Sequence, residues 1–288
     1  MNTNSNTYTV IYSTILVVVV AAVLAFVAKF LQPTQDENVK KDTISQILTA
    51  ADIQVAEGAD VLAIYKENLD TVLVFKVDGT EWNREDLIKD KAVLSKEDCS
   101  VYDNSMLKKQ MIADEGAKKL PVYIFKNGIT VIPCYGAGLW GPVWGYIGLA
   151  DDLNTIKKAC FGHKGETPGL GAKITDEPAV FADKFEGKKI GSGDVLFTVG
   201  KNVDLESKPN ENAVNAISGA TITSQSVGKS LNQWFGFYQE YFKKYGVKAE
   251  CEQTETQVAP NQPEPAESEE ATPTAEAETE TPAEPVNE

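Results

Sequence analysis

The residues best suited to carry chemistry are the small and hydroxyl-bearing side chains of the run Ser218-Gly219-Ala220-Thr221-Ile222-Thr223-Ser224. They stand just before an expected helix, where unpaired backbone N–H groups and the positive end of the helix dipole attract an anion such as phosphate. Gly219 and Ala220 would let a bulky group approach the backbone closely. Because Ser and Thr are also preferred N-cap residues, composition alone favours an ordinary helix cap over an anion site.

The string from Ser218 to Thr221 resembles the flavinylation motif of the FMN-binding domain family. That family includes the B and C subunits of the sodium-translocating NADH:quinone reductase and the G subunit of the related Rnf complex. The resemblance implies that a separate flavin transferase joins FMN to Thr221 through a phosphoester, with Ser218, Gly219, Ala220 and Thr223 around the cofactor. The family motif usually begins with Asp three residues before the serine, where this chain has Asn215.

A second segment, Glu166-Thr167-Pro168-Gly169-Leu170-Gly171, resembles the ETPGLG stretch that precedes SGAT in the same family. The resemblance implies that Glu166, Thr167, Leu170 and Gly171 also contribute to the flavin site. Pro and Gly are typical of a tight loop, which could present Leu170 and backbone groups to a flavin ring. A structural surface turn is the alternative interpretation of this segment on its own.

A third segment, Gly136 to Gly145, resembles the G-x-G-L-W-G stretch of the reductase's C subunit and favours that relative over the Rnf protein. Trp140 could form a wall of the flavin site, and a core or interface position is the alternative. His163 could transfer protons near neutral pH, but a polar loop residue is the preferred interpretation. No catalytic side chain is therefore assigned.

The resemblance implies an electron-transfer subunit of an NADH:quinone reductase that transports Na⁺, with no complete reaction on this chain alone. Electrons would arrive from NADH through a partner's FAD and an iron–sulfur centre, reach FMN on Thr221, and continue to the B subunit and quinone. The expected partners are the other members of a six-subunit complex, especially B, D, E and F. The alternatives are the Rnf protein, or a membrane-anchored binding or scaffold module without redox chemistry.

These segments require elements that anchor and position them. The uncharged, predominantly apolar run from Val10 to Ala28 is long enough to cross a bilayer as a helix. The stretch before it lacks the basic residues of a signal peptide, and no clean cleavage site precedes the polar sequence that follows the apolar run. We expect an N-terminal tail at 1–9, a transmembrane helix at 10–31, an extracytoplasmic FMN-binding domain at 32–249 and a disordered acidic tail at 250–288.

Two features of the sequence disagree about the side of the membrane on which the main domain lies. The first basic residues, Lys29, Lys40 and Lys41, follow the apolar run, which favours a cytoplasmic domain. The family resemblance instead implies a single-pass protein of the bacterial inner membrane with its main domain on the periplasmic side. Because large domains can cross regardless of flanking charge, we expect the periplasmic orientation.

The charge of the chain is concentrated in its tail. Residues 250–288 hold twelve glutamates and no Lys or Arg, so of the net charge of −15 about −3 belongs to the rest. The remainder has no basic stripe of the kind that binds nucleic acid. Cys99, Cys134, Cys160 and Cys251 form no C-x-x-C pair, so we expect buried or idle thiols and no metal site, with disulfides left open.

Local patterns predict an α+β fold with a small, mainly antiparallel sheet and packed helices. Runs rich in β-branched and aromatic residues predict strands at 71–77, 121–125, 129–134 and 195–199, with an Asn127-Gly128 hairpin turn. Apolar residues at helical spacing predict a short juxtamembrane helix within 36–58 and a last helix from Ser224 to Tyr245, followed by Gly246.

Overall fold

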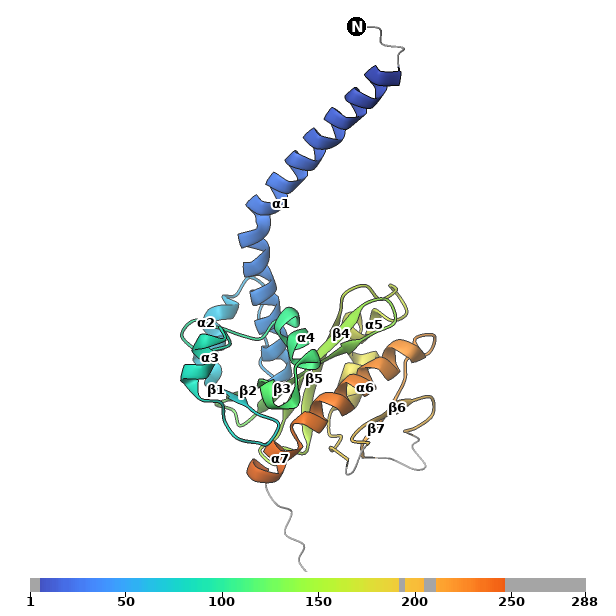
Figure 1. The fold of residues 1–288 in the computed structure, drawn as a ribbon. Helices are drawn as coiled ribbons and strands as arrows, with labels where there is room; N and C mark the ends of the chain where they lie inside the picture. Colours follow the sequence, from blue (N-terminus) through green and yellow to red (C-terminus); the bar gives the residue numbers. More distant parts are fainter. Residues whose placement is uncertain (1–5, 192–194, 205–210, 247–288) are drawn as a thin grey trace, which may run out of the picture. The chain divides into compact units, whose positions relative to one another are not determined.

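The computed structural model describes residues 6–191, 195–204 and 211–246. The predicted acidic tail, its Cys251 and the first five residues lie outside this part of the chain. The chain enters the described part as α1, Asn6–Ala50, which is a single helix of 45 residues (Figure 1). By its length and the apolar composition of its first half, α1 could cross a membrane.

The predicted anchor and juxtamembrane helix form one element rather than two. α1 continues through Pro33, and one face of its last two turns is buried, through Thr43, Ile44, Ile47, Leu48 and Ala50. It ends earlier than the predicted limit of 58, because Asp52 adopts a left-handed conformation with φ 57°. The N–H of Ile53 then donates to the carbonyl of Leu48 over 2.9 Å, a bond typical of helix ends.

Five antiparallel strands follow in sequential order and make the main sheet, so the predicted fold class is confirmed. The strands are β1 Leu69–Phe75, β2 Leu120–Phe125, β3 Thr130–Ala137, β4 Pro142–Leu149 and β5 Ile156–His163. The predicted Asn127-Gly128 turn joins β2 to β3, with Gly128 at φ +84°. The sequence patterns did not predict β4 and β5, because the glycines of β4 weaken the strand signal.

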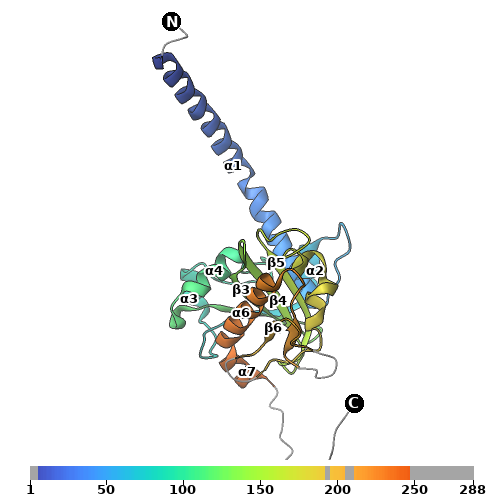
Figure 2. The same ribbon diagram turned by 90° about the vertical axis from the view of Figure 1, so that its right-hand side faces the viewer.

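The sheet is covered on both faces (Figures 1 and 2). The end of α1 packs on β4 and β5, where the Trp144 indole donates to the Gln46 side chain over 2.8 Å. α6, Thr221–Phe237, packs on β3 and β4 from the other side, and the Trp234 indole donates to the carbonyl of Tyr135 over 2.8 Å. The β3–β4 hairpin therefore connects the membrane-proximal helix with α6.

The helix predicted from Ser224 to Tyr245 is wrong in its start and in its continuity, whereas its end at Tyr245 is confirmed. α6 begins three residues earlier, at Thr221, and the chain divides at Tyr238 before α7, Gln239–Tyr245. The break has a tertiary cause, since the buried Tyr238 hydroxyl donates to the carbonyl of Pro121 over 2.7 Å. Gly246 follows α7 as expected, but at φ −68° rather than in the left-handed region.

A second sheet has two parallel strands, β6 Thr198–Gly200 and β7 Ala213–Asn215. The predicted strand at 195–199 only overlaps β6, because the Asn232 side chain of α6 already binds the backbone N–H groups of Leu196 and Phe197. These two strands bring the turn after Gly200 beside the segment that leads into α6.

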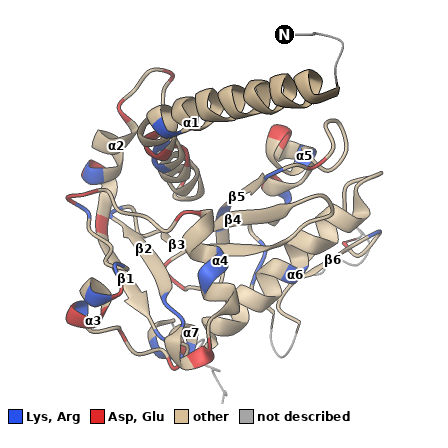
Figure 3. Ribbon diagram, turned by 45° about the horizontal axis from the view of Figure 1, so that its top comes forward, with Lys and Arg blue, Asp and Glu red and all other residues tan. Residues whose placement is uncertain are grey.

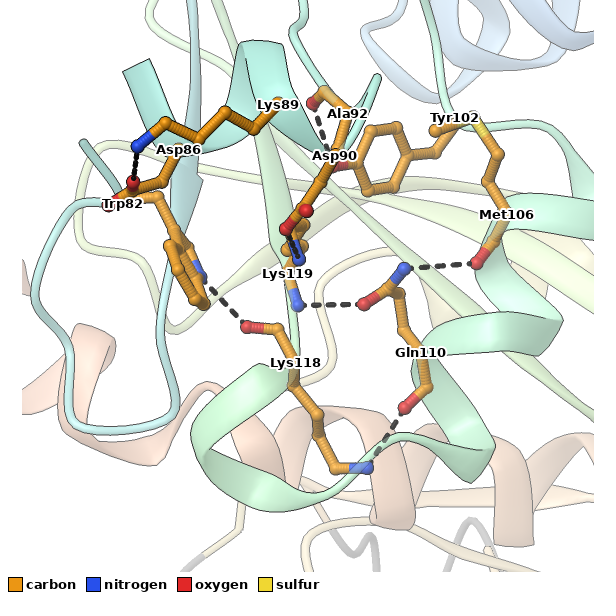
Figure 4. A network of polar contacts seen from close by, with 10 residues as sticks. All are labelled: Trp82, Asp86, Lys89, Asp90, Ala92, Tyr102, Met106, Gln110, Lys118 and Lys119. Carbon is orange, nitrogen blue, oxygen red and sulfur yellow. Dashed lines mark hydrogen bonds and ion pairs between the residues drawn. The ribbon is translucent and has the colours of Figure 1, made fainter. Parts of the chain in front are cut away.

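Short helices complete the described part of the fold. They are α2 Val61–Asn68, α3 Arg84–Lys89, α4 Asn104–Ile112, η1 Glu115–Ala117, α5 Lys173–Asp176, η2 Pro178–Val180 and η3 Ala182–Phe185. Figure 4 shows how α4 is tied to the start of β2: the buried Lys118 ammonium donates to the carbonyl of Gln110 over 2.9 Å. On α3 and α7, basic and acidic residues are neighbours (Figure 3), as in the exposed pair Lys243–Glu240.

The packing of the end of α1 on the sheet predicts that a side chain at Gly148 would strongly lower the stability of the protein. A Cβ at this position would overlap the backbone carbonyl of Ala50, which cannot swing aside as a flexible side chain can. Gly148→Ala should lower the free energy of unfolding by roughly 1–3 kcal/mol, measured by thermal denaturation in detergent. Gly236→Ala is the control, because a Cβ there meets nothing and Ala favours a helix. Equal stability of the two variants would contradict the close packing of α1 against Gly148.

Candidate functional site

One pocket of about 500 Å³ lies where four parts of the chain meet. These are the loop between β3 and β4, the segment after β5, the turn after β6 and the first turn of α6. Its volume falls in the usual range for small-molecule sites. It is lined by Leu139, Trp140, Glu166, Thr167, Leu170, Gly171, Lys201, Gly219, Ala220, Thr221, Ile222 and Thr223.

The structure thus brings together nine of the ten residues that the sequence placed at the site. The tenth, Ser218, is exposed and lies outside the pocket lining. Sequence reasoning missed Leu139, Ile222 and Lys201. Leu139 and Ile222 are immediate sequence neighbours of predicted site residues, and this adjacency is the signal that could have identified them. Lys201 lies in a stretch with no motif, and only the pairing of β6 with β7 places it there.

The start of α6 differs from an ordinary Ser/Thr-capped helix. Its N-cap residue is Ala220, and no side chain caps the helix. The Ser224 hydroxyl instead accepts from the N–H of Ile217 over 3.1 Å and donates to the carbonyl of Ala220 over 2.9 Å. The Thr221 hydroxyl makes no hydrogen bond to another described residue. The capping explanation for the hydroxyl cluster therefore loses its main support, and the first turn is left open to an anion.

The carboxylate of Glu166 is the polar centre of the site. Glu166 is buried, and its Oε1 accepts from the N–H groups of Leu139 and Trp140 over 2.8 and 3.0 Å. Its Oε2 accepts from the hydroxyl of Thr223 over 2.7 Å. One side chain thus joins the β3–β4 loop, the segment after β5 and α6. Since both oxygens are occupied by the chain itself, Glu166 acts as a positioning residue.

Glycines allow these segments to approach one another. A Cβ on Gly171 would come within 2.7 Å of Glu166 Oε2 and 2.8 Å of Thr223 Oγ1. Gly219, at φ +80°, lies beside Leu170, so the two motif segments are in contact. A larger residue at Gly171 would separate the carboxylate from Thr223, and one at Gly219 would push against Leu170.

The mouth of the pocket is apolar and exposed. Trp140 is 69% exposed, and Leu139, Leu170 and Ile222 are exposed by 47%, 44% and 58%. Trp140 is therefore not a core residue, although core packing was one alternative for it. Exposed apolar side chains around a pocket are typical of a binding site. Together with a threonine hydroxyl, an open helix end and a lysine, they fit a planar aromatic ligand that carries a phosphate.

The remaining candidate groups lie away from the pocket lining. His163, at the end of β5, accepts the N–H of Glu166 at Nδ1 over 3.2 Å, which supports the turn that aims the carboxylate. Among the described residues no cluster of His, Cys, Asp or Glu could hold a metal ion. Cys99, Cys134 and Cys160 are free, and burial raises the pKa of each thiol, to about 12 for Cys160.

Comparison with known proteins defines the class first. Residues 138–236 match the FMN-binding domain, a range that holds the two segments Glu166–Gly171 and Ser218–Thr221 in full and the third segment from residue 138 onward. The chain is 29% identical to the C subunit of the Na(+)-translocating NADH-quinone reductase of Haemophilus ducreyi, covering 85% of this chain and 95% of that protein. It is 30% identical to the corresponding protein of Pasteurella multocida, covering 74% and 84%.

A solved structure agrees with these relatives. The crystal structure of the C subunit from Parabacteroides distasonis has a TM-score of 0.58 and 28% identity, covering 74% of this chain and 96% of that one. The chain belongs to the family of C subunits of the Na⁺-translocating NADH-quinone reductase, an enzyme of several subunits. Its FMN-binding domain and the long apolar helix α1 fit a membrane-anchored flavoprotein of that complex.

The hydrogen bonds of Glu166 predict a graded response to substitution. Glu166→Ala would leave the part-buried N–H groups of Leu139 and Trp140 without their acceptor, at a cost of about 1 kcal/mol for each group. Glu166→Gln should cost much less, because its amide oxygen can accept from both N–H groups while its NH₂ donates to Thr223. Urea denaturation of the purified protein measures both. Similar losses in the two variants would contradict the proposed hydrogen-bond role.

Proposed function

We propose that this chain carries FMN on Thr221 through a phosphoester bond and serves as an electron-transfer subunit of a Na⁺-translocating NADH:quinone reductase. The observation that carries the proposal is the difference between two neighbouring hydroxyls. Thr221 lines the pocket and its hydroxyl has no partner among the described residues. Thr223 is buried, and its hydroxyl is bonded to Glu166. Of these two hydroxyls, only that of Thr221 can therefore be reached by an incoming phosphate without breaking the bond to Glu166.

The attachment reaction would be a phosphoryl transfer from FAD, catalysed by a separate flavin transferase. The Thr221 oxygen would form a bond to the phosphorus of the FMN half, the bond between the two phosphates of FAD would break, and AMP would leave. The hydroxyl proton is released in the same step. The first turn of α6 can receive the resulting phosphate, because its N–H groups point along the helix axis toward it.

The chain's own residues then hold and shield the cofactor. Bound FMN would supply the electron-transfer chemistry, while the protein determines its position and surroundings. Leu139, Trp140, Leu170 and Ile222 offer apolar surface for the flavin ring. Glu166 keeps the three segments of the pocket together through Leu139, Trp140 and Thr223. A covalent bond at Thr221 would prevent loss of the carrier between electron transfers.

In the complex, electrons would come from NADH through a partner's FAD and an iron–sulfur centre and would leave toward FMN on the B subunit and then quinone. The proposed partners are the other five subunits, especially B, D, E and F. Relatives named as the C subunit of this reductase support this assignment over the G subunit of an Rnf complex. A membrane-anchored scaffold without a flavin remains the alternative that a colourless mature protein would favour.

Variants of the two threonines test the attachment. After co-expression with a flavin transferase, Thr221→Ala should abolish covalent flavin, because the acceptor oxygen is removed. Thr223→Val should retain it, since the substitution keeps the shape and removes only the bond to Glu166. In-gel flavin fluorescence after denaturation, with mass spectrometry of the tryptic peptide, measures both.

The opposite pattern, with flavin retained in Thr221→Ala and lost in Thr223→Val, would refute the assignment. The wild-type chain expressed without the transferase provides the control for loosely bound flavin, because it should lose all colour on denaturation.

We further propose that α1 crosses the bacterial inner membrane once and that the flavin domain lies on the periplasmic side. Fusions of the full chain at its C-terminus test this orientation. Alkaline phosphatase, which is active only in the periplasm, should be active in the fusion, whereas a fused green fluorescent protein exported in unfolded form should stay dark. An inactive phosphatase and a bright fluorescent fusion would place the domain in the cytoplasm, as Lys29, Lys40 and Lys41 by themselves suggest.

A further inference from the structure

Lys201 is the charged residue of the pocket that has no role so far. It lines the pocket together with Thr221 and Glu166. Among the described lining residues it is the one basic side chain, and Glu166 is the one acidic side chain. The carboxylate of Glu166 is occupied by three hydrogen bonds from the chain. The ammonium of Lys201 forms no ion pair or hydrogen bond with another described residue, so its charge is available to a ligand.

The backbone on both sides of Lys201 is fixed. The preceding Gly200 ends β6, lies opposite Asn215 of β7, and accepts the N–H of Ala216 over 2.7 Å. The following Asn202 has a φ of 53°, which turns the chain sharply. Lys201 is therefore held beside Ala216, two residues before the SGAT segment begins. The strand pairing brings this lysine to the site despite a separation of 20 residues from Thr221.

Asn215 completes this support. Its Oδ1 accepts from the N–H groups of Val203 and Asp204 over 2.9 and 3.2 Å, and its Nδ2 donates to the carbonyl of Asp204 over 2.7 Å. An aspartate at this position could accept the first two bonds but could not donate the third. The asparagine that departs from the usual motif is thus matched to the turn that carries Lys201.

We propose that Lys201 is a positioning and charge-balancing residue whose ammonium faces the ring system of the flavin. This inference rests on the proposed attachment of FMN to Thr221. The first turn of the 17-residue α6 already provides backbone donors for the phosphate, whereas no other described lining residue offers a positive charge to the ring. An electron added without a proton leaves one negative charge on the ring, and a nearby cation stabilises that reduced form.

The test is a redox titration of the full chain in detergent after co-expression with a flavin transferase. Lys201→Met should lower the midpoint potential of the covalent flavin by ~59 mV. For one electron, this shift corresponds to a tenfold lower ratio of reduced to oxidised flavin at a given potential. Lys201→Arg should titrate close to the wild type, because the charge is kept. Since Lys201 is exposed, the difference between wild type and Lys201→Met should shrink at high salt.

Lys229→Met is the matched control. Lys229 is an exposed lysine of α6 outside this pocket, so its loss changes the net charge equally and should leave the potential unchanged. An unshifted potential in fully loaded Lys201→Met would overturn the inference. A lower yield of covalent flavin in Lys201→Met, with an unshifted potential in the fraction that is loaded, would also overturn it, because Lys201 would then serve the phosphate. A wild-type chain without covalent flavin would refute the Thr221 attachment and this inference together.

Discussion

The buried carboxylate of Glu166 is the constraint on which the site depends. A charged group with almost no contact with water must have its oxygens satisfied, and here three donors from two separate segments do so. The requirement fixes the β3–β4 loop against α6. It also explains the small residues around it, because a side chain at Gly171 would occupy the space of these bonds.

The same carboxylate separates the chemistry of two threonines that are almost adjacent in sequence. By binding Thr223 it removes that hydroxyl from the pocket surface and leaves Thr221 as the accessible one. Helix geometry reinforces the difference, since residues two positions apart on a helix point to different sides. An Ala at the N-cap leaves the first turn without a side-chain partner, which suits a phosphate better than a Ser or Thr there would.

Much of the site could be predicted from sequence because its residues lie in three short segments with recognisable patterns. The hairpin turn at Asn127-Gly128 and the antiparallel sheet also follow from local rules. What could not be predicted depends on tertiary contacts. β4 forms despite its glycines because Gly145 and Gly148 allow close approach of Phe161 and Ala50. The place of Lys201 depends on a parallel strand pair that is only three residues long.

A structure of the flavin-loaded protein, after maturation by a flavin transferase, tests the central claim most directly. The account predicts continuous density from Oγ1 of Thr221 to the flavin phosphate, a ring against the apolar mouth of the pocket, and Glu166 still bonded to Thr223. An unmodified Thr221 beside an empty pocket, or a flavin joined to Thr223 with the Glu166 bond broken, would contradict it.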